Sequence, residues 1–99
     1  MGTVHVVSHK AIRKFCEEHP RACNALDRWY RVAKRATWSS FAEVTESFNT
    51  ADFVAPHVVF DIGGNKYRLV AWINFHYGVV YVRFIGTHRA YDAIDPQTI

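Results

Sequence analysis

Three strand-like runs separated by two glycine-containing dipeptides constrain the fold of this chain more than any other feature. In chain order, the runs and dipeptides are residues 57–62, Gly63-Gly64, 65–75, Tyr77-Gly78 and 79–85. Both dipeptides suit two-residue hairpin turns, the first better than the second. The C-terminal half is therefore predicted to form consecutive antiparallel hairpins.

The N-terminal half shows helical periodicity instead. Ser8 and Pro20 are suited to the first turns of two helices, and Ser40-Phe41-Ala42-Glu43 forms a capping box for a third. The expected elements are a strand over 3–7, helices over about 9–19 and 20–36, and a short helix over 41–48. This order, β-α-α-(α)-β-β-β, predicts an α+β fold with an antiparallel sheet packed against the N-terminal helices. The length predicts a single domain over residues 1–99.

Strand alternation sorts the side chains of the predicted hairpins between two faces. With two-residue loops, Phe60 pairs with Tyr67, Trp72 pairs with Arg83, and Arg68 lies opposite Thr87. The side chains expected to face the helices are Phe60, Ile62, Tyr67, Leu69, Ala71, Ile73, Val80, Val82 and Phe84. Those expected on the outer face are Asp61, Lys66, Arg68, Trp72, Tyr81 and Arg83.

The last predicted strand runs into residues 86–92, which read Gly-Thr-His-Arg-Ala-Tyr-Asp. Cleaving RNA without a metal requires a base, an acid, cations for the phosphate and contacts that hold the flanking bases. The guanidinium groups of Arg68 and Arg83 suit the phosphate, because they can bind it with two parallel hydrogen bonds. His88 can transfer protons near neutral pH, and Tyr91 could orient a proton or stack on a base. The further side chains expected to bind RNA are Lys66, Trp72, Tyr81 and Arg89.

Each of these side chains also has an ordinary structural explanation. Lys66 opposite Asp61 could be only a cross-strand ion pair, and Arg83 could rest on the Trp72 ring. His88 could cap or brace a turn. Tyr91 could fill the end of the core. The residues alone therefore leave two functions open, an enzyme or a non-catalytic module that binds RNA or protein.

The charge of the chain is mildly positive, with a net charge of +3 and a basic surplus in the N-terminal half. Arg28, Arg31 and Arg35 share one helix face, which is either solvated or meets RNA or an acidic partner. Cys16 and Cys23 have neither metal-ligand spacing nor a disulfide framework, which predicts free thiols in a reducing cytoplasm. We expect no metal, no cofactor and no membrane segment.

Four stretches resemble one known family. They are residues 4–11, 51–53, 63–70 and 81–92, with the segments Gly-Gly-Asn-Lys-Tyr-Arg-Leu and Gly-Thr-His-x-x-Tyr-Asp as the most specific. They are similar to the HigB toxin family of type II toxin–antitoxin systems, within the RelE-like superfamily. The fold of that family is the β-α-α-β-β-β order expected above.

The resemblance implies a ribosome-dependent mRNA interferase that cuts translated mRNA without a metal, through attack by the ribose 2′-oxygen. It implies a HigA-type helix-turn-helix antitoxin, and contact with operator DNA only through the toxin–antitoxin complex. The antitoxin is expected either over the outer sheet face or along the arginine stripe. By motif position, Arg68 matches the family's phosphate-binding arginine, and His88 and Tyr91 match the residues after the last strand. His88 departs from the namesake toxin, which has an arginine there.

Overall fold

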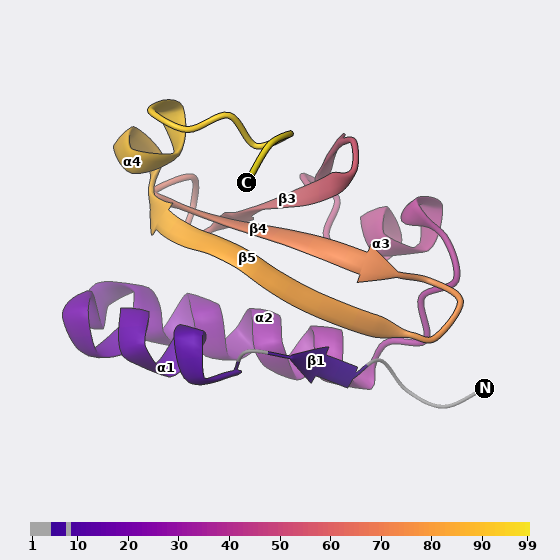
Figure 1. Ribbon diagram of the computed structural model, residues 1–99. Helices are drawn as coiled ribbons and strands as arrows, with labels where there is room; N and C mark the ends of the chain where they lie inside the picture. The colour runs from indigo at the N-terminus through magenta and orange to yellow at the C-terminus, as the bar shows by residue number, and fades with distance from the viewer. Residues whose placement is uncertain (1–4, 8) are drawn as a thin grey trace.

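The computed structural model describes residues 5–7 and 9–99 (Figure 1). Its elements are β1 (His5–Val7), α1 (His9–Glu18), a 3-10 helix (Pro20–Ala22), α2 (Cys23–Arg35), α3 (Phe41–Ser47), β2 (Asp52–Val54), β3 (His57–Ile62), β4 (Tyr67–Asn74), β5 (Val79–Thr87) and α4 (His88–Asp92). The predicted α+β fold is confirmed. The candidate cap Ser8 lies outside the described residues.

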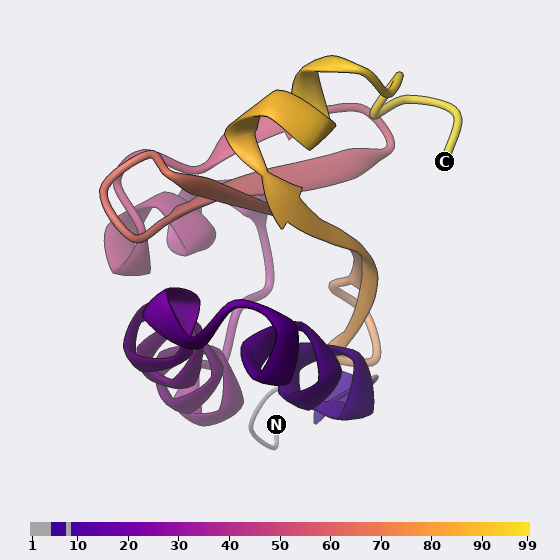
Figure 2. The same cartoon turned by 90° about the vertical axis from the view of Figure 1, so that its left-hand side faces the viewer.

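One five-stranded sheet organises the molecule, in the order β1-β5-β4-β3-β2. β1 runs parallel to β5 and the other neighbours are antiparallel, so the sheet is mixed rather than purely antiparallel. α1 and α2 cover one face, here called the inner face (Figure 1). α4 and the C-terminal segment lie over the opposite, outer face (Figure 2). No helix in the described part of the chain is long and apolar enough to cross a bilayer.

The predicted capping box is present at the start of α3. The Ser40 hydroxyl accepts a hydrogen bond from the Glu43 backbone N–H at 3.4 Å. The Glu43 carboxylate, however, accepts from the side chain and backbone N–H of Ser39, and these bonds lower the pKa of Glu43. The Ser40 hydroxyl and the Glu43 carboxylate therefore both fix the start of this helix. A capping box would have the carboxylate accept from the Ser40 N–H, and here it accepts from Ser39 instead.

The core fills the space between the inner face and the helices. Trp29 of α2 and Phe60 of β3 lie at its centre with almost no exposed surface, and their ring centroids are 5.3 Å apart. Phe48 packs edge-on against Phe60, also at 5.3 Å. These aromatic contacts join the helical half of the chain to the strand half, so the sheet and α2 depend on each other.

Both hairpin loops contain four residues, so the predicted pairing register is wrong. Phe60 pairs with Leu69 rather than Tyr67, and Trp72 pairs with Tyr81 rather than Arg83. In the first loop, three successive residues, 63–65, adopt positive φ angles, which lengthens the turn beyond the Gly-Gly pair. The register shifts by two residues, so most side chains keep their predicted face, because strand alternation has a period of two.

A β-bulge at Arg83 changes the facing of the rest of β5. Ala71 pairs with Val82 and Val70 pairs with Phe84, which leaves Arg83 as the extra residue. Phe84 therefore lies on the outer face, and the prediction that it faces the helices is wrong. Ile85 packs against the core in its place.

A second apolar layer lies on the outer face. Val59, Val70 and Phe84 form one row across β3, β4 and β5, and both valines are buried although they face away from the helices. α4 and the segment after it lie over this face (Figures 1 and 2). His57 Nδ1 is 2.7 Å from the carbonyl oxygen of Pro96, which fastens the C-terminal segment to the start of β3.

Cys16 and Cys23 form a disulfide, so the prediction of free thiols is wrong. The 3-10 turn between α1 and α2 brings their Cα atoms to 4.9 Å, within the range that a disulfide spans. Their spacing in the sequence shows nothing of this, because the two helix ends meet only through that tight turn.

Replacing Phe60 should destabilise the fold much more than replacing another phenylalanine. We expect Phe60→Ala to lower the free energy of unfolding by about 3–5 kcal/mol, because it empties the centre of the core. Phe53→Ala is the matched control: Phe53 is 51% exposed, and we expect a loss below about 1 kcal/mol. Urea unfolding followed by circular dichroism measures both, and equal losses would contradict this view of the core.

Candidate active site

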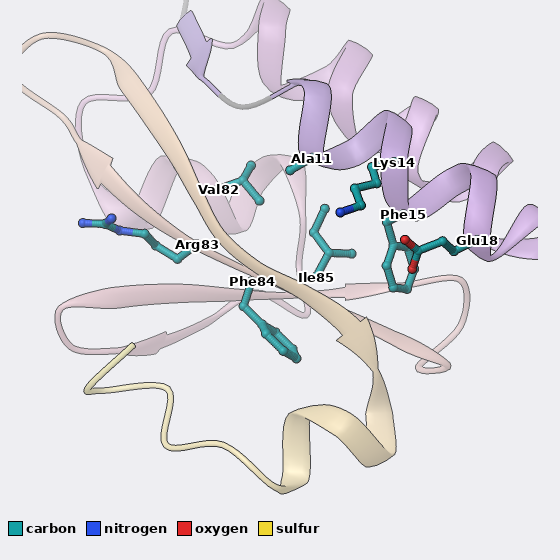
Figure 3. A pocket seen from close by; sticks show the side chains of 8 residues that line it. All are labelled: Ala11, Lys14, Phe15, Glu18, Val82, Arg83, Phe84 and Ile85. Atoms are coloured by element: carbon teal, nitrogen blue, oxygen red, sulfur yellow. The ribbon is translucent and has the colours of Figure 1, made fainter.

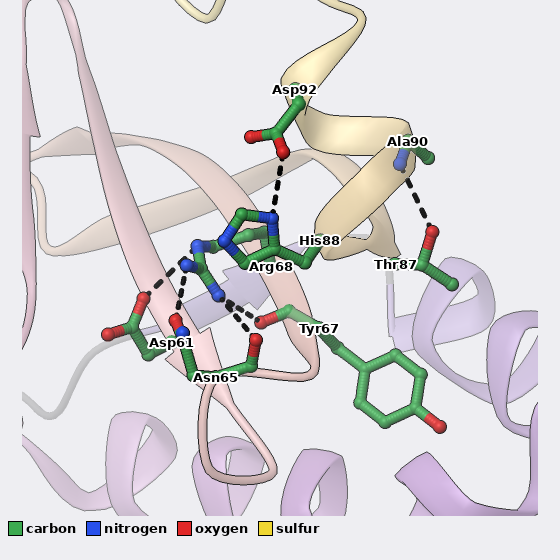
Figure 4. Close-up of polar contacts among 8 residues, drawn as sticks. All are labelled: Asp61, Asn65, Tyr67, Arg68, Thr87, His88, Ala90 and Asp92. Carbon is green, nitrogen blue, oxygen red and sulfur yellow. Dashed lines mark hydrogen bonds and ion pairs between the residues drawn. The ribbon is translucent and has the colours of Figure 1, made fainter.

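Arg68 lies at the centre of a polar cluster on the outer face (Figure 4). Its side chain is buried beside α4, with the residue 8% exposed. Nε is 3.2 Å from Asp61 Oδ1, and Nη1 donates to the carbonyl oxygens of Asn65 and Tyr67, each at 3.2 Å. Nη2 donates to the side-chain oxygen of Asn65. The guanidinium is thus both neutralised and held in one orientation.

These contacts limit how Arg68 can meet a phosphate. A guanidinium has five N–H donors on three nitrogens; here Nη1 and Nη2 donate three hydrogen bonds, and Nε faces the Asp61 carboxylate in an ion pair. A contact through two parallel hydrogen bonds would need two free donors, so it requires Asp61 or Asn65 to give way. In the described arrangement, all three guanidinium nitrogens already contact protein oxygens, so Arg68 offers mainly its positive charge.

The ion pair between Lys66 and Asp61, which was the alternative explanation for Lys66, is not formed, because Asp61 pairs with Arg68. Lys66 instead lies in the β3–β4 loop with an exposed side chain. Its carbonyl oxygen accepts a hydrogen bond from the backbone N–H of His88 at 2.9 Å. That bond joins the β3–β4 loop to the first residue of α4.

His88 forms a pair with Asp92 on the exposed side of α4. Thr87, not His88, caps the helix, since its hydroxyl accepts from the Ala90 N–H at 3.1 Å. His88 Nδ1 is 3.0 Å from Asp92 Oδ2, across one helical turn. A carboxylate only accepts, so this bond places a proton on Nδ1 and leaves Nε2 with a free lone pair in the neutral ring. The His88 side chain is 44% exposed, which leaves room for a substrate.

Tyr91 lies half-buried against Arg68 rather than in the helix-side core. The guanidinium carbon of Arg68 is 5.8 Å from the centroid of the Tyr91 ring, within the range of a cation–π contact. Burial raises the pKa of the Tyr91 phenol, and the nearby Arg68 charge offsets only part of that effect. Tyr91 therefore keeps its proton at neutral pH, so it can donate a hydrogen bond but not act as a base.

The other predicted residues lie apart from this cluster. Trp72 and Tyr81 pack together, with ring centroids 5.3 Å apart. Trp72 is four residues along β4 from Arg68, a separation of roughly 13 Å at about 3.3 Å per residue. Arg83 is exposed at the bulge and Arg89 is exposed on α4, and the expected packing of Arg83 on Trp72 is not seen. Within residues 5–7 and 9–99, no three His, Cys, Asp or Glu side chains gather to hold a metal ion.

Comparison with known proteins identifies the family of the chain. A family model described as HigB_toxin, the RelE-like toxic component of a toxin–antitoxin system, matches residues 22–94. The chain belongs to the HigB toxin family. It is 30% identical over 94 residues to the mRNA interferase HigB of Escherichia coli O6:H1, covering 92% of this chain and 91% of the relative. Relatives from Escherichia coli strain K12 and Shigella flexneri, each also named an mRNA interferase, are 27% identical over 92 residues, covering 90% of this chain and 88% of theirs.

Sequence reasoning missed two partners in the cluster of this HigB-family protein, Asn65 and Asp92. The signal for Asp92 was available: it follows His88 by four residues, the spacing at which helical side chains meet. The sequence analysis predicts the last strand over 79–85 and expects no helix after it, so this spacing carries no weight there. Asn65 gives no such signal, since its contact with Arg68 follows from its own positive φ angle.

Removing the partner of Arg68 should cost more stability than removing a surface partner. Asp61→Ala leaves a buried guanidinium without its carboxylate, and we expect a loss of about 1–3 kcal/mol in the free energy of unfolding. Asp27→Ala breaks an exposed pair with Arg31 and should cost about 0–1 kcal/mol. Thermal unfolding of both variants checks this, and an unchanged Asp61→Ala would show that Arg68 is not held as described.

Proposed function

We propose that this chain is an mRNA endoribonuclease that acts without a metal, through attack by the ribose 2′-oxygen on the neighbouring phosphate. Family membership supports a toxin, and the relatives' names supply mRNA as the substrate. The observation that carries the reaction is the His88–Asp92 pair beside the buried Arg68. A base with a fixed tautomer and a fixed positive charge are two of the elements that this reaction needs.

In the proposed reaction, His88 Nε2 takes the proton from the 2′-hydroxyl. The 2′-oxygen then bonds to phosphorus, the bond from phosphorus to the 5′-oxygen breaks, and the leaving oxygen takes a proton. Asp92 would keep the imidazole in the reactive tautomer and stabilise its charged form. Tyr91, which keeps its proton, is suited to donate to the leaving 5′-oxygen. The products are a 2′,3′-cyclic phosphate and a 5′-hydroxyl.

The cations would divide into two roles. Arg68, held by Asp61 and Asn65, would stabilise the developing negative charge without reorganising, which is how preorganised charges lower a barrier. Arg83, Lys66 and Arg89 have exposed side chains and would hold the RNA backbone. The Trp72–Tyr81 pair would stack on a base, a contact worth about 1–3 kcal/mol in single-stranded nucleic-acid sites.

The family implies an antitoxin partner. We further propose that the partner is of the HigA type with a helix-turn-helix domain, and that operator DNA is met only through that complex. We propose that the substrate is mRNA on the translating ribosome, which places the protein in the cytoplasm. There the Cys16–Cys23 disulfide would face reducing conditions.

A second candidate is a non-catalytic module that binds RNA or protein on the outer face. The contacts of Arg68 favour it, since all three guanidinium nitrogens already contact protein oxygens that a phosphate would have to displace. The two candidates predict different products: the enzyme cleaves mRNA, whereas the module binds and leaves it intact.

Substitution of His88 should abolish the proposed reaction. We expect His88→Ala to lower the cleavage rate by about 10²–10⁴-fold and to relieve growth arrest on induction, because it removes the proposed base. Asp92→Asn should give a smaller fall, since Nε2 remains but its tautomer is no longer held. His76→Ala, an exposed histidine in the β4–β5 loop, is the control and should stay fully toxic. Full toxicity of His88→Ala would rule out this site.

The chemistry can be tested separately through the ends of the cleaved mRNA. We expect fragments from induced cells and from purified translating ribosomes to carry 2′,3′-cyclic phosphate and 5′-hydroxyl ends. Because no metal takes part in the proposed reaction, we also expect cleavage in vitro to continue when EDTA is added after the ribosomes are fixed on the message. Primer extension locates the cuts, and phosphatase sensitivity identifies the ends. Binding with no cleavage would favour the module, while 3′-hydroxyl ends would exclude attack by the 2′-oxygen.

A further inference from the structure

The edge of β5 is only partly covered. β1 pairs with three residues of β5, Val79–Tyr81, although β5 extends to Thr87. Among the described residues, no strand pairs with that edge over residues 82–87. An unpaired strand edge presents backbone N–H and C=O groups, to which another chain can add as a strand.

A groove runs beside this free edge, between α1 and β5. It encloses about 280 Å³, and Val82 and Ile85 point across it toward α1, while Phe84 points the other way (Figure 3). Phe15 of α1 completes an apolar floor, and Lys14 and Glu18 lie at its polar rim. The groove can therefore receive apolar side chains from a segment that lies along β5.

The surroundings of the groove carry excess positive charge. Lys10, Arg13, Lys14 and Glu17 line an adjoining hollow of about 500 Å³ on α1. Within the part of the chain that the structure describes, none of these three cations forms an ion pair. By contrast, Arg31 on the α2 stripe already pairs with Asp27. The α1 side of the groove is thus the better match for an acidic segment.

We propose that an extended, acidic segment of the antitoxin adds as a strand to residues 82–87 of β5. Its apolar side chains would enter the groove, and its carboxylates would lie near Lys10 and Lys14. The inference rests on the family's antitoxin partner, not on the proposed nuclease reaction. RNA fits less well, because it cannot continue the backbone hydrogen bonding of a sheet, and Glu17 and Glu18 would repel its phosphates.

The position of this edge links binding to inhibition. Thr87, the last residue of β5, caps α4, and His88 follows it directly. A strand bound along residues 82–87 would therefore end beside the His88–Asp92 pair. It would also cover the backbone of Arg83, a residue assigned to RNA binding. One extended segment could then exclude RNA without entering the cluster around Arg68.

Amide hydrogen exchange of the full toxin, free and in complex with the antitoxin encoded beside its gene, tests the proposal. We expect slower exchange over residues 82–87 in the complex. Peptides tiled along the antitoxin should identify one acidic segment that gives the same protection alone. Unchanged exchange over 82–87, with protection confined to α2 or to the strands of the outer face, would overturn the proposal. The proposal would also be overturned if a uridine decamer slowed exchange over residues 82–87 and no antitoxin peptide did.

A pair of charge reversals gives a second, independent test. Lys14→Glu should weaken antitoxin binding at least tenfold in isothermal titration, whereas Arg35→Glu, the same charge change on the α2 stripe, should alter it less than threefold. Equal affinity of Lys14→Glu and wild type would overturn the proposal. Toxicity is scored apart from binding: a non-toxic wild type whose residues 82–87 are protected would end the nuclease proposal and leave this one standing.

Discussion

The buried charge of Arg68 is the constraint on which the outer face depends. A guanidinium taken from water must be paired and hydrogen-bonded, and Asp61 on β3 and Asn65 in the following loop supply those partners. The hydrogen bonds from Arg68 to Asn65 fix the β3–β4 loop. The carbonyl oxygen of Lys66 in this loop then accepts from the first N–H of α4. The position of His88 therefore depends on how Arg68 is held, because the Arg68–Asn65 bond and the Lys66–His88 bond connect the two residues.

The second constraint is the bulge at Arg83, which decides what each half of β5 faces. Before it, alternation places Val80 and Val82 toward the helices; after it, Ile85 takes the core position and Phe84 turns outward. The outward Phe84 completes the row with Val59 and Val70, which gives α4 and the C-terminal segment an apolar surface to cover. Without the extra residue, α4 would begin on the other side of the sheet.

Sequence reasoning predicted most facings and the element order apart from β2 and α4, because those depend on periodicity, which neighbouring residues carry. It assigned the wrong register because loop length depends on backbone angles. Asn65 has a positive φ angle, as Gly63 and Gly64 do, and a Gly-Gly pair alone does not predict this. Only tertiary structure produces the Cys16–Cys23 disulfide and the contacts of Arg68. The candidate residues themselves were recognisable, since arginine, histidine and tyrosine side chains were gathered where a strand needed none of them.

The structure divides the predicted RNA-binding face into two parts. Arg68, His88 and Tyr91 lie at one end, Trp72 and Tyr81 at the other, and between them Val70 has no exposed surface. An RNA strand cannot contact the sheet along β4 from one part to the other. Arg83 is exposed on β5 between Tyr81 and His88, so a strand that passes along β5 would meet this cation at the bulge. The same irregularity that turns Phe84 outward thus places a cation between the two parts, and a partner strand along that edge would obstruct access to it.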